Sequence, residues 1–220
     1  MAVITIDGDA RSGKDTIGKI IAKESSFLHL PVNNLYHNVI ATLAPEWLDE
    51  DKAQAVLANW SPKQIQNYLR NLIFATDQIN LKVVDYENVI CEVIDFDENI
   101  FHIDLTENEI EHSAGQALAQ IAAQGKELQE FINEAIMEFS QNNDLIVTGQ
   151  SVGYLFTNPP VHANDIYKIK LGPLKDEDQK YDLVVEGKQP LMQIVHQIMT
   201  DFQHVVLQPK TKKTNTGLQR

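Results

Sequence analysis

The amino-terminal segment constrains the fold of this chain more than any other feature of its sequence. Residues 2–6 (AVITI) are apolar or β-branched, and the sequence GDARSGK follows at residues 8–14. Isoleucines then recur at the spacing of one helix face in residues 16–25. The sequence predicts a short buried strand over residues 2–6, a loop over 7–13 and a helix over 16–25.

Strand and helix patterns return in the second half of the chain. Short runs rich in apolar residues occupy residues 144–148, 165–171 and 181–185, and a helical pattern covers 191–202. Because helices alternate with short apolar strands, the pattern favours the α/β class, with a mostly parallel sheet covered by helices on both faces.

The middle of the chain has a different pattern, which predicts a small inserted α+β lobe. A helical pattern over residues 61–76 is followed by three short strand patterns between residues 83 and 104. Residues 108–139 then predict one long amphipathic helix or two consecutive ones divided at Gly125.

The length and composition suit one sizeable core, since the chain has 220 residues of which 43% are hydrophobic. We therefore expect one domain over residues 1–208, whose core comprises 1–44 and 108–208. The inserted lobe spans about residues 45–107 in this interpretation. A flexible basic tail with little apolar content follows over residues 209–220.

Charge and composition disfavour several classes of partner. The formal net charge of −13 disfavours binding to DNA or RNA, because phosphate contacts need clustered cations. No stretch reaches the ~18 consecutive apolar residues of a membrane span, and the amino terminus has no signal-peptide pattern. We expect a cytoplasmic protein without nucleic-acid or membrane partners. Cys91, the only cysteine, has the setting of a small apolar strand residue.

The GDARSGK sequence has the spacing G-x-x-x-x-G-K of a phosphate-binding loop. In such a loop the glycines let backbone N–H groups face phosphate oxygens, the lysine reaches the β and γ phosphates, and a hydroxyl holds Mg²⁺. The amino terminus of the following helix adds its dipole. We expect ATP and Mg²⁺ as ligands and Lys14 as the catalytic residue; the alternative is an ordinary glycine-rich turn. The candidate ATP-binding residues are Gly8, Asp9, Ala10, Arg11, Ser12, Gly13, Lys14, Asp15 and Thr16.

Asp15 stands where the phosphate-loop pattern has serine or threonine. A carboxylate beside phosphates repels them unless a cation lies between the two groups. Two arrangements avoid this repulsion: Thr16 supplies the hydroxyl ligand to Mg²⁺, or Asp15 approaches Mg²⁺ through water. The string RSGKDT (residues 11–16) resembles the loop of phage-type deoxynucleoside monophosphate kinases, which implies that aspartate here is compatible with an active enzyme.

From this loop onward the chain resembles the cytidylate kinases, with landmarks in the same order over nearly its whole length. Residues 4–14 (ITIDGDARSGK) resemble the family string IDGPAGSGK, and residues 27–40 (FLHLPVNNLYHNVI) resemble YLDTGAMYRAV. Residues 104–110 (DLTENEI) resemble DVTEEI, 120–123 (QIAA) resemble QVAA, and 145–153 (LIVTGQSVG) resemble the start of LVADGRDMGTVVFP. The resemblance implies a P-loop sheet, a nucleoside-monophosphate lobe, a mobile lid and ATP-dependent phosphorylation of a CMP- or dCMP-type acceptor.

The chain departs from the family at positions that would contact the acceptor nucleotide. Pro31 stands where the family has an aspartate, and His37 stands where it has the arginine after a tyrosine. Gln150 and Ser151 replace an arginine and an aspartate that, by resemblance, contact the nucleotide and its base. Gln129 lies near the position of another phosphate-binding arginine. The resemblance implies the following candidate substrate-binding residues: Tyr36, His37, Gln129, Gln150 and Ser151.

The arginine-rich lid of the family is also shortened, to LGPLKDEDQKY at residues 171–181. Phosphoryl transfer depends on positioning and on electrostatic stabilisation, commonly by arginine forks and Mg²⁺. This chain has three arginines: Arg11 in the loop, Arg70 in the middle segment and Arg220 in the tail. The lysines near the lid that could act as point charges instead are Lys168, Lys170, Lys175 and Lys180.

The sequence leaves three hypotheses for function. The first is a cytidylate-kinase-like phosphotransferase that uses ATP and Mg²⁺, with a nucleoside monophosphate as acceptor. The second is a related module that has lost catalysis and acts in nucleotide binding or protein interaction. The third, a chain that binds no nucleotide, predicts a closed loop, or Arg11 or Lys14 paired with Asp9 or Asp15.

Replacing the residues at two acceptor positions by those of the family should create kinase activity. If the scaffold is that of a cytidylate kinase, the double substitution Gln150→Arg with Ser151→Asp restores the pair that contacts the nucleotide. We expect CMP phosphorylation to appear in a coupled assay of ADP release when the wild-type chain is inert. The absence of any gain would assign the defect to the shortened lid instead.

Overall fold

The computed structural model is an α/β protein with a five-stranded, all-parallel main sheet. It describes residues 2–83, 89–95, 97–104, 113–150, 152–156, 165–173, 181–185 and 189–206. The main-sheet strands lie in the spatial order β2-β6-β1-β7-β8. Their bounds are β1 (Ala2–Gly8), β2 (Leu28–Pro31), β6 (Leu145–Gly149), β7 (Asp165–Leu171) and β8 (Leu183–Val185).

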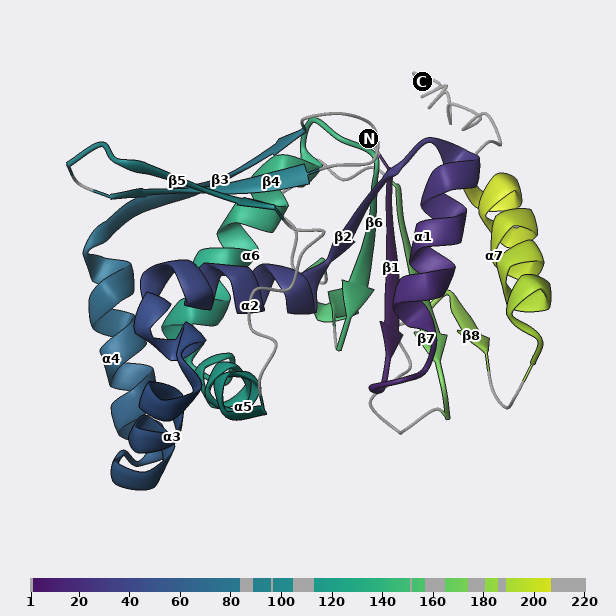
Figure 1. Ribbon diagram of the computed structural model, residues 1–220. Coiled ribbons are helices and arrows are strands. Elements are labelled where there is room, and N and C mark those ends of the chain that lie inside the picture. Colours follow the sequence, from purple (N-terminus) through teal and green to yellow (C-terminus); the bar gives the residue numbers. More distant parts are fainter. Residues whose placement is uncertain are drawn as a thin grey trace, which may run out of the picture.

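Helices cover both faces of the main sheet, as Figure 1 shows. α1 and α7 share a hydrophobic cluster with one face, whereas α2, α5 and α6 share a cluster with the other. The predicted α/β class, with a parallel sheet between two helical layers, is therefore confirmed. The helices of these layers are α1 (Lys14–Ser25), α2 (Val32–Leu43), α5 (Ser113–Ala122), α6 (Lys126–Ser140) and α7 (Leu191–Val206).

The central strand β1 is buried along its whole length. Its side chains alternate between the two faces: Ile4 and Ile6 pack with α1 and α7, whereas Val3 packs with α2 and α6. β6 pairs with one edge of β1 and β7 pairs with the other. Because both faces and both edges are covered, β1 can offer polar groups to a ligand only at its ends.

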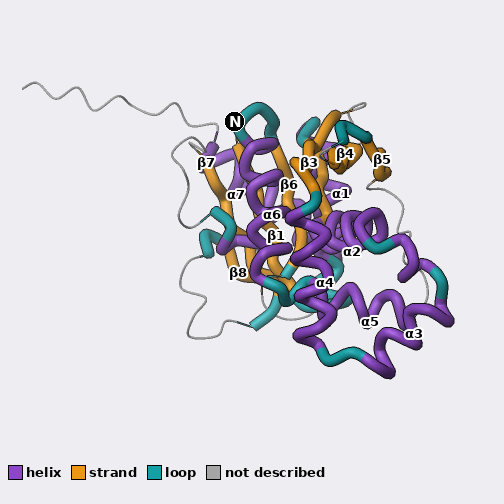
Figure 2. The backbone as a smooth tube through the Cα atoms, turned by 90° about the vertical axis from the view of Figure 1, so that its left-hand side faces the viewer, coloured by secondary structure: helices purple, strands orange, loops and turns teal. Residues whose placement is uncertain are grey.

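The chain between α2 and α5 forms a second sheet and further helices. This sheet is antiparallel, with the order β3-β4-β5, and contacts α2 and α6. Trp47 is fully buried in the same hydrophobic cluster as α2 and α5. Figure 2 shows α3, α4 and α5 grouped at one end of the molecule. The elements are the 3-10 helix η1 (Pro45–Leu48), α3 (Glu50–Asn59), α4 (Pro62–Phe74), β3 (Thr76–Val83), β4 (Val89–Asp95) and β5 (Ile100–Asp104).

Most predicted elements are present, with shifted ends, but β3 begins at Thr76, the last residue of the helix predicted over 61–76 and seven residues before the strand pattern at residue 83. β1 continues two residues beyond the predicted strand, and α1 begins at Lys14 rather than at Thr16. Gly125 is the N-cap of α6, so the long helical pattern is divided there into α5 and α6. β2 and α2 are not among the predicted elements, because Pro31 ends a strand of only four residues and the helix follows without a loop.

Three further predictions concern Cys91, membrane-spanning helices and the carboxyl-terminal tail. Cys91 is fully buried in β4, as an apolar strand residue should be, and burial raises the pKa of its thiol to about 12. Among the described helices none has the length and apolar character needed to cross a bilayer. The predicted tail over residues 209–220 lies outside the described residues, and the proposed domain boundaries stay a prediction.

Candidate functional site

The carboxyl ends of the central strands meet at one edge of the main sheet. Asp7, near the end of β1, lies opposite Gly149 of β6 and Lys170 of β7. From β1 the chain continues towards β2 on one side, whereas from β7 it continues to β8 on the other. Ligands of open α/β sheets bind outside the carboxyl ends of the strands at such a reversal of direction. The glycine loop, residues 8–13, begins at this point.

The glycine loop is compact because small residues meet inside it. A Cβ atom on Gly8 would lie 2.4 Å from the Ser12 hydroxyl oxygen, so only glycine leaves room for that side chain. Gly13 has a φ of 84° and Arg11 a φ of 65°, both in the left-handed region. The Ser12 N–H donates to the Asp9 carbonyl at 3.1 Å. The Ser12 hydroxyl is buried and has no hydrogen-bond partner among the described residues.

α1 begins directly after the loop, with Gly13 as its N-cap. No side chain among the described residues caps this end of the helix. The Ile17 N–H donates to the Gly13 carbonyl at 2.9 Å, which begins the intrahelical hydrogen bonds. The preceding N–H groups and the positive end of the helix dipole can therefore serve an anion.

Lys14, the first residue of α1, is only 3% exposed. Its Nζ lies 3.5 Å from Asp15 Oδ2, beyond the N···O distance of about 2.7–3.2 Å that a good hydrogen bond has. Asp15 is the one ionic partner that the described part of the chain gives this ammonium group. An ammonium has three donors and is costly to bury unpaired. Lys14 therefore keeps hydrogen-bonding capacity that an anionic ligand would satisfy.

Asp15 is held from its other side by the end of β6. The Thr148 hydroxyl donates to Asp15 Oδ1 at 2.6 Å, and Thr148 Oγ1 lies 3.0 Å from His29 Nε2. A threonine hydroxyl has one proton, which is directed to Asp15, so His29 donates its Nε2–H to Thr148. The three side chains form a directed hydrogen-bond chain from β2 through β6 to the first turn of α1.

Gly18 lets α1 approach this hydrogen-bond chain closely. A Cβ atom on Gly18 would lie 2.5 Å from Thr148 Cγ2 and 2.8 Å from His29 Nε2. Burial lowers the pKa of His29 to about 4, although the Asp15 carboxylate acts in the opposite direction. His29 is therefore neutral at neutral pH and donates through one ring nitrogen.

A second carboxylate, Asp7, is fully buried at the end of β1. It accepts hydrogen bonds from the N–H groups of Val152 and Gly153, at 2.5 and 3.1 Å, and from the Tyr181 hydroxyl. A Cβ atom on Gly153 would lie 2.8 Å from Asp7 Oδ2, so glycine permits this approach. Burial raises the pKa of Asp7, against the lowering effect of these hydrogen bonds and of Lys170. Asp7 thus joins β1 to the 3-10 helix η2 (Val152–Tyr154) after β6 and to the segment before β8.

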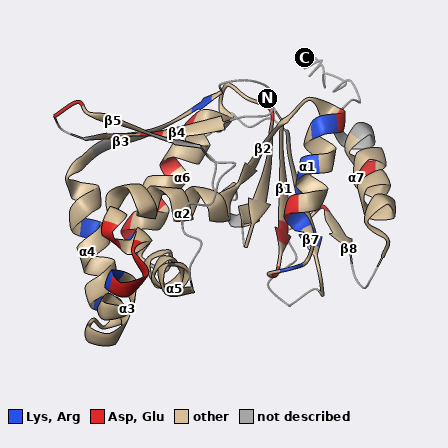
Figure 3. Ribbon diagram, in the orientation of Figure 1, with Lys and Arg blue, Asp and Glu red and all other residues tan. Residues whose placement is uncertain are grey.

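Charges of both signs lie near the loop. Asp9 and Arg11 are exposed on the loop itself, and Figure 3 shows both signs at the loop end of α1. The Lys170 ammonium lies 5.6 Å from the centroid of the Tyr181 ring, within the range of a cation–π contact. The field is therefore mixed, and an anion would bind through specific donors rather than through a general positive surface.

The acceptor residues implied by the family resemblance lie on separate elements. Gln150 is exposed directly after β6, at the same sheet edge as the glycine loop. Tyr36 and His37 are half-buried on α2, and burial raises the pKa of Tyr36 to about 12. Gln129 is exposed on α6, where its side-chain amide donates to a carbonyl of the α5–α6 turn at 2.8 Å. Ser151 lies outside the described residues.

The structure describes some of the other arginines and lysines that are candidates for phosphate contact. Arg70 lies on α4, and its guanidinium is 3.9 Å from Glu127 Oε1 in the first turn of α6. Lys168 and Lys170 belong to β7, whereas the lid positions Lys175 and Lys180 lie outside the described residues. Of the two arginines that the structure describes, Arg11 is thus the one on the glycine loop.

Four residues of this site are not among the predicted site residues: Asp7, His29, Thr148 and Tyr181. Each acts across the fold: the Thr148–Asp15 pair spans 133 residues of sequence, and the Tyr181–Asp7 pair spans 174. One signal was present, because Asp7 and Thr148 each close an apolar strand run, and the carboxyl ends of parallel strands share an edge. No comparable signal marks His29 or Tyr181.

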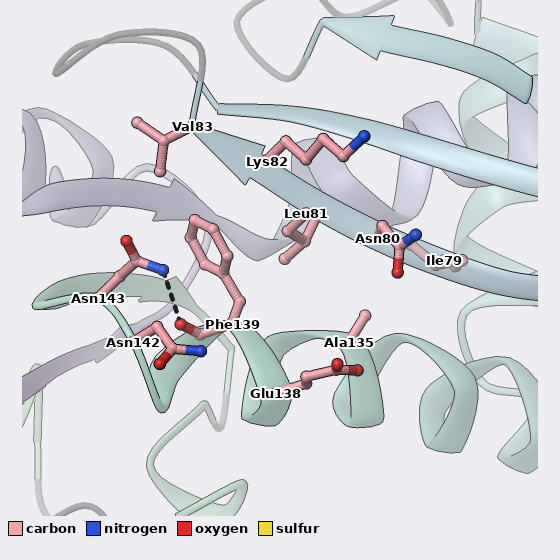
Figure 4. Close-up of a pocket in the computed structure, with 10 residues that line it drawn as sticks. All are labelled: Ile79, Asn80, Leu81, Lys82, Val83, Ala135, Glu138, Phe139, Asn142 and Asn143. Carbon is pink, nitrogen blue, oxygen red and sulfur yellow. Dashed lines mark hydrogen bonds between the residues drawn. The ribbon is translucent and has the colours of Figure 1, made fainter.

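A pocket of about 430 Å³ lies elsewhere, between β3 and α6 (Figure 4). Its lining includes Leu81 and Val83 from β3, Phe139 from α6, and Asn142 and Asn143 after that helix. The Asn143 side-chain amide donates to the Phe139 carbonyl at 2.9 Å. Because Asn143 lies two residues before the start of β6, this pocket lies towards the amino ends of the main-sheet strands, away from the glycine loop.

Oxygen ligands for a hard cation are present at the loop end of α1. Asp15 is half exposed there, and Thr16 beside it is exposed. The described residues hold no group of three His, Cys, Asp or Glu side chains that could bind a metal by themselves. Mg²⁺ is usually bound by one or two carboxylates together with water and substrate phosphates. The donors therefore fit a Mg²⁺ ion that arrives with phosphate groups.

No protein-family model matches the chain, and no curated protein matches it.

The buried Asp7 carboxylate predicts a defined pH dependence of stability. Because burial raises the pKa of Asp7 above its ordinary value of 3.8, the native state binds this proton more tightly than the unfolded state does. Stability from this group is present below pH 3.8 and is lost as pH rises through the raised native pKa. We therefore expect wild type to lose stability relative to Asp7→Asn as pH rises. The unfolding free energy of wild type minus that of the variant should decrease from about pH 4 to about pH 7.

The measurement is urea unfolding of both proteins across this pH range. Asp9→Asn, a change of an exposed carboxylate on the same loop, is the matched control for the loss of one carboxylate charge. A difference between wild type and Asp7→Asn that stays constant with pH would contradict the raised pKa.

Proposed function

We propose that this protein binds ATP with Mg²⁺ at the glycine loop and transfers the γ-phosphate to a nucleoside monophosphate. In this proposal the main sheet is of the P-loop type, and the part between α2 and α5 is an inserted lobe for the acceptor. The landmarks shared with the cytidylate kinases support an acceptor of the CMP or dCMP type.

The observation that carries the proposal is the state of Lys14. Its ammonium is almost completely buried next to a loop with the phosphate-binding spacing, and its one described ionic partner stands 3.5 Å away. The Ser12 hydroxyl, in the same loop, is buried and has no hydrogen-bond partner among the described residues. These donors lie beside a helix amino terminus that no described side chain caps, and a phosphate group would satisfy them.

Each part of the loop has its own role in this proposal. Backbone N–H groups of the glycine loop and of the first turn of α1 bind phosphate oxygens, and Lys14 steadies the β and γ phosphates. Asp15 or Thr16 receives Mg²⁺, which when bound neutralises phosphate charge during transfer. Arg11, exposed on the loop, adds a positive charge at its outer edge. Gln150, at the same sheet edge, stays an acceptor candidate by resemblance, as do Tyr36, His37 and Gln129.

A second function, nucleotide binding without catalysis, is favoured by the lack of arginines among the described residues at the acceptor side of the loop. Gln150 is an exposed amide where the family string has an arginine, and Arg70 lies on α4 rather than on the glycine loop. Arginine forks are common stabilisers of the transferring phosphoryl group, and an amide carries no charge. Under this alternative the loop still binds ATP, and the protein acts as a nucleotide-dependent interaction module.

A loop that binds no nucleotide predicts that Lys14 is paired internally, and the Lys14–Asp15 contact is of that kind. However, its 3.5 Å separation is too long to satisfy the ammonium, and the half-exposed Asp15 is already held by Thr148. The contact therefore leaves Lys14 with donors to offer, which supports the nucleotide-binding proposals.

The loop proposal predicts that Lys14 dominates nucleotide affinity. We expect wild type to bind a non-hydrolysable ATP analogue with Mg²⁺ in the micromolar range, and Lys14→Ala to bind at least about tenfold more weakly, because charge-assisted hydrogen bonds are lost. Isothermal titration calorimetry measures both. Lys23→Ala, which removes an exposed lysine from the last turn of the same helix, is the control and should bind like wild type.

Unchanged affinity in Lys14→Ala would show that the loop is not the phosphate site, and both nucleotide-binding proposals would fall. Where the analogue binds as expected, a panel of nucleoside monophosphates with ATP separates the two functions. Turnover of any member supports the phosphotransferase, whereas binding without turnover across the panel supports the interaction module.

A further inference from the structure

The Asp15–Thr148 contact exchanges the usual positions of a hydroxyl and a carboxylate. In phosphate-loop enzymes Mg²⁺ is held by a serine or threonine of the loop and by a separate aspartate. In this chain the loop position is Asp15, and the string LIVTG puts Thr148 where the cytidylate-kinase string LVADG has its aspartate. The structure brings the two together, with the Thr148 hydroxyl donating to Asp15 Oδ1 at 2.6 Å.

We propose that Asp15 and Thr148 form a reversed pair, in which the loop supplies the carboxylate for Mg²⁺ and the strand supplies the hydroxyl, with His29 as a positioning residue. The inference rests on the proposed function and deepens it. It selects Asp15 over Thr16 as the loop side chain on the metal side and adds Thr148 and His29 to the site. One carboxylate and one hydroxyl are retained, so the formal charge of the pair is unchanged by the reversal.

The hydrogen-bond directions give this pair one arrangement. An ionised carboxylate only accepts, so the Thr148 proton points to Asp15, and the Thr148 oxygen accepts from His29 Nε2 at 3.0 Å. Each carboxylate oxygen has two acceptor positions. Asp15 can therefore keep its bond from Thr148 while it also accepts from a water of the Mg²⁺ shell.

Packing around the pair distinguishes Asp15 from Thr16. Gly18 has no side chain, and a Cβ atom there would collide with Thr148 and His29. α1 can therefore lie close enough to β6 for the Asp15 contact. Thr16, in contrast, is exposed, and its hydroxyl has no hydrogen bond to any described residue. The fold thus orients the Asp15 carboxylate at the sheet edge and leaves the Thr16 hydroxyl without support.

A double-mutant cycle tests the reversed pair through the Mg²⁺ enhancement, the ratio of affinities for the ATP analogue with Mg²⁺ and with EDTA. Calorimetry gives both affinities without catalysis. Asp15→Thr and Thr148→Val each remove one half of the pair, and we expect each to lower the ratio at least about tenfold. Asp15→Thr combined with Thr148→Asp restores the usual order, and should return the ratio to within about threefold of wild type.

Matched controls separate this role from a general effect of buried threonines. Thr5 is fully buried on β1, and its hydroxyl has no partner among the described residues, so Thr5→Val should leave the ratio unchanged. Thr148→Ser keeps the hydroxyl and should keep the ratio. Nitrogen-15 spectra of the histidine rings should show His29 as the Nε2–H tautomer in wild type, and the opposite tautomer would overturn its positioning role.

The outcomes distinguish this inference from the proposed function. If wild type binds the analogue and Thr148→Val keeps the full Mg²⁺ enhancement, the reversed pair is wrong while the nucleotide site stands. A folded double exchange that stays as weak as Asp15→Thr alone leads to the same conclusion. If the double exchange does not fold, the comparison of Thr148→Val with Thr148→Ser decides. If wild type binds no nucleotide, the proposed function and this inference fall together.

Discussion

The structure depends on the complete enclosure of β1. All seven of its residues are buried, its two edges pair with β6 and β7, and its side chains alternate between two hydrophobic clusters. Polar chemistry is therefore confined to the point where the strand ends, at Asp7 and Gly8. The same constraint applies to β6, whose five residues are buried and which ends at Thr148 and Gly149. Because parallel strands end at one edge, enclosure of the apolar strands is what gathers the polar groups of the candidate site.

This enclosure also explains which features the sequence predicts. The apolar runs that become β1, β6 and β7 are visible as patterns, and so are the glycine loop and the helices with one apolar face. β2 and α2 are not, because a four-residue strand joined directly to a helix at Pro31 has no period long enough to recognise. Among site residues, the loop positions follow from spacing, whereas His29, Thr148 and Tyr181 depend on contacts between distant segments. Such contacts are set by the register of the sheet, which no local pattern contains.

The site contains more carboxylates than a phosphate site would be expected to hold, and the fold engages those that lie closest to it. Asp7 accepts three hydrogen bonds and is fully buried, and Asp15 accepts from Thr148. Lys14 and Ser12, in contrast, keep donors that no described residue fills. The balance at the loop thus favours an incoming anion despite the formal net charge of −13 for the whole chain. It also answers the problem posed by Asp15, whose carboxylate is oriented by the strand beside it rather than left facing phosphate.

The central claim is that the glycine loop and the first turn of α1 form a phosphate site. Its most direct test is a backbone-amide NMR titration of the full chain with Mg²⁺ and a non-hydrolysable ATP analogue. We expect the largest chemical-shift changes on the amides of residues 8–16, with smaller changes at the ends of β6 and β7. Changes confined to other regions, such as the pocket between β3 and α6, or no change at saturating nucleotide, would contradict it.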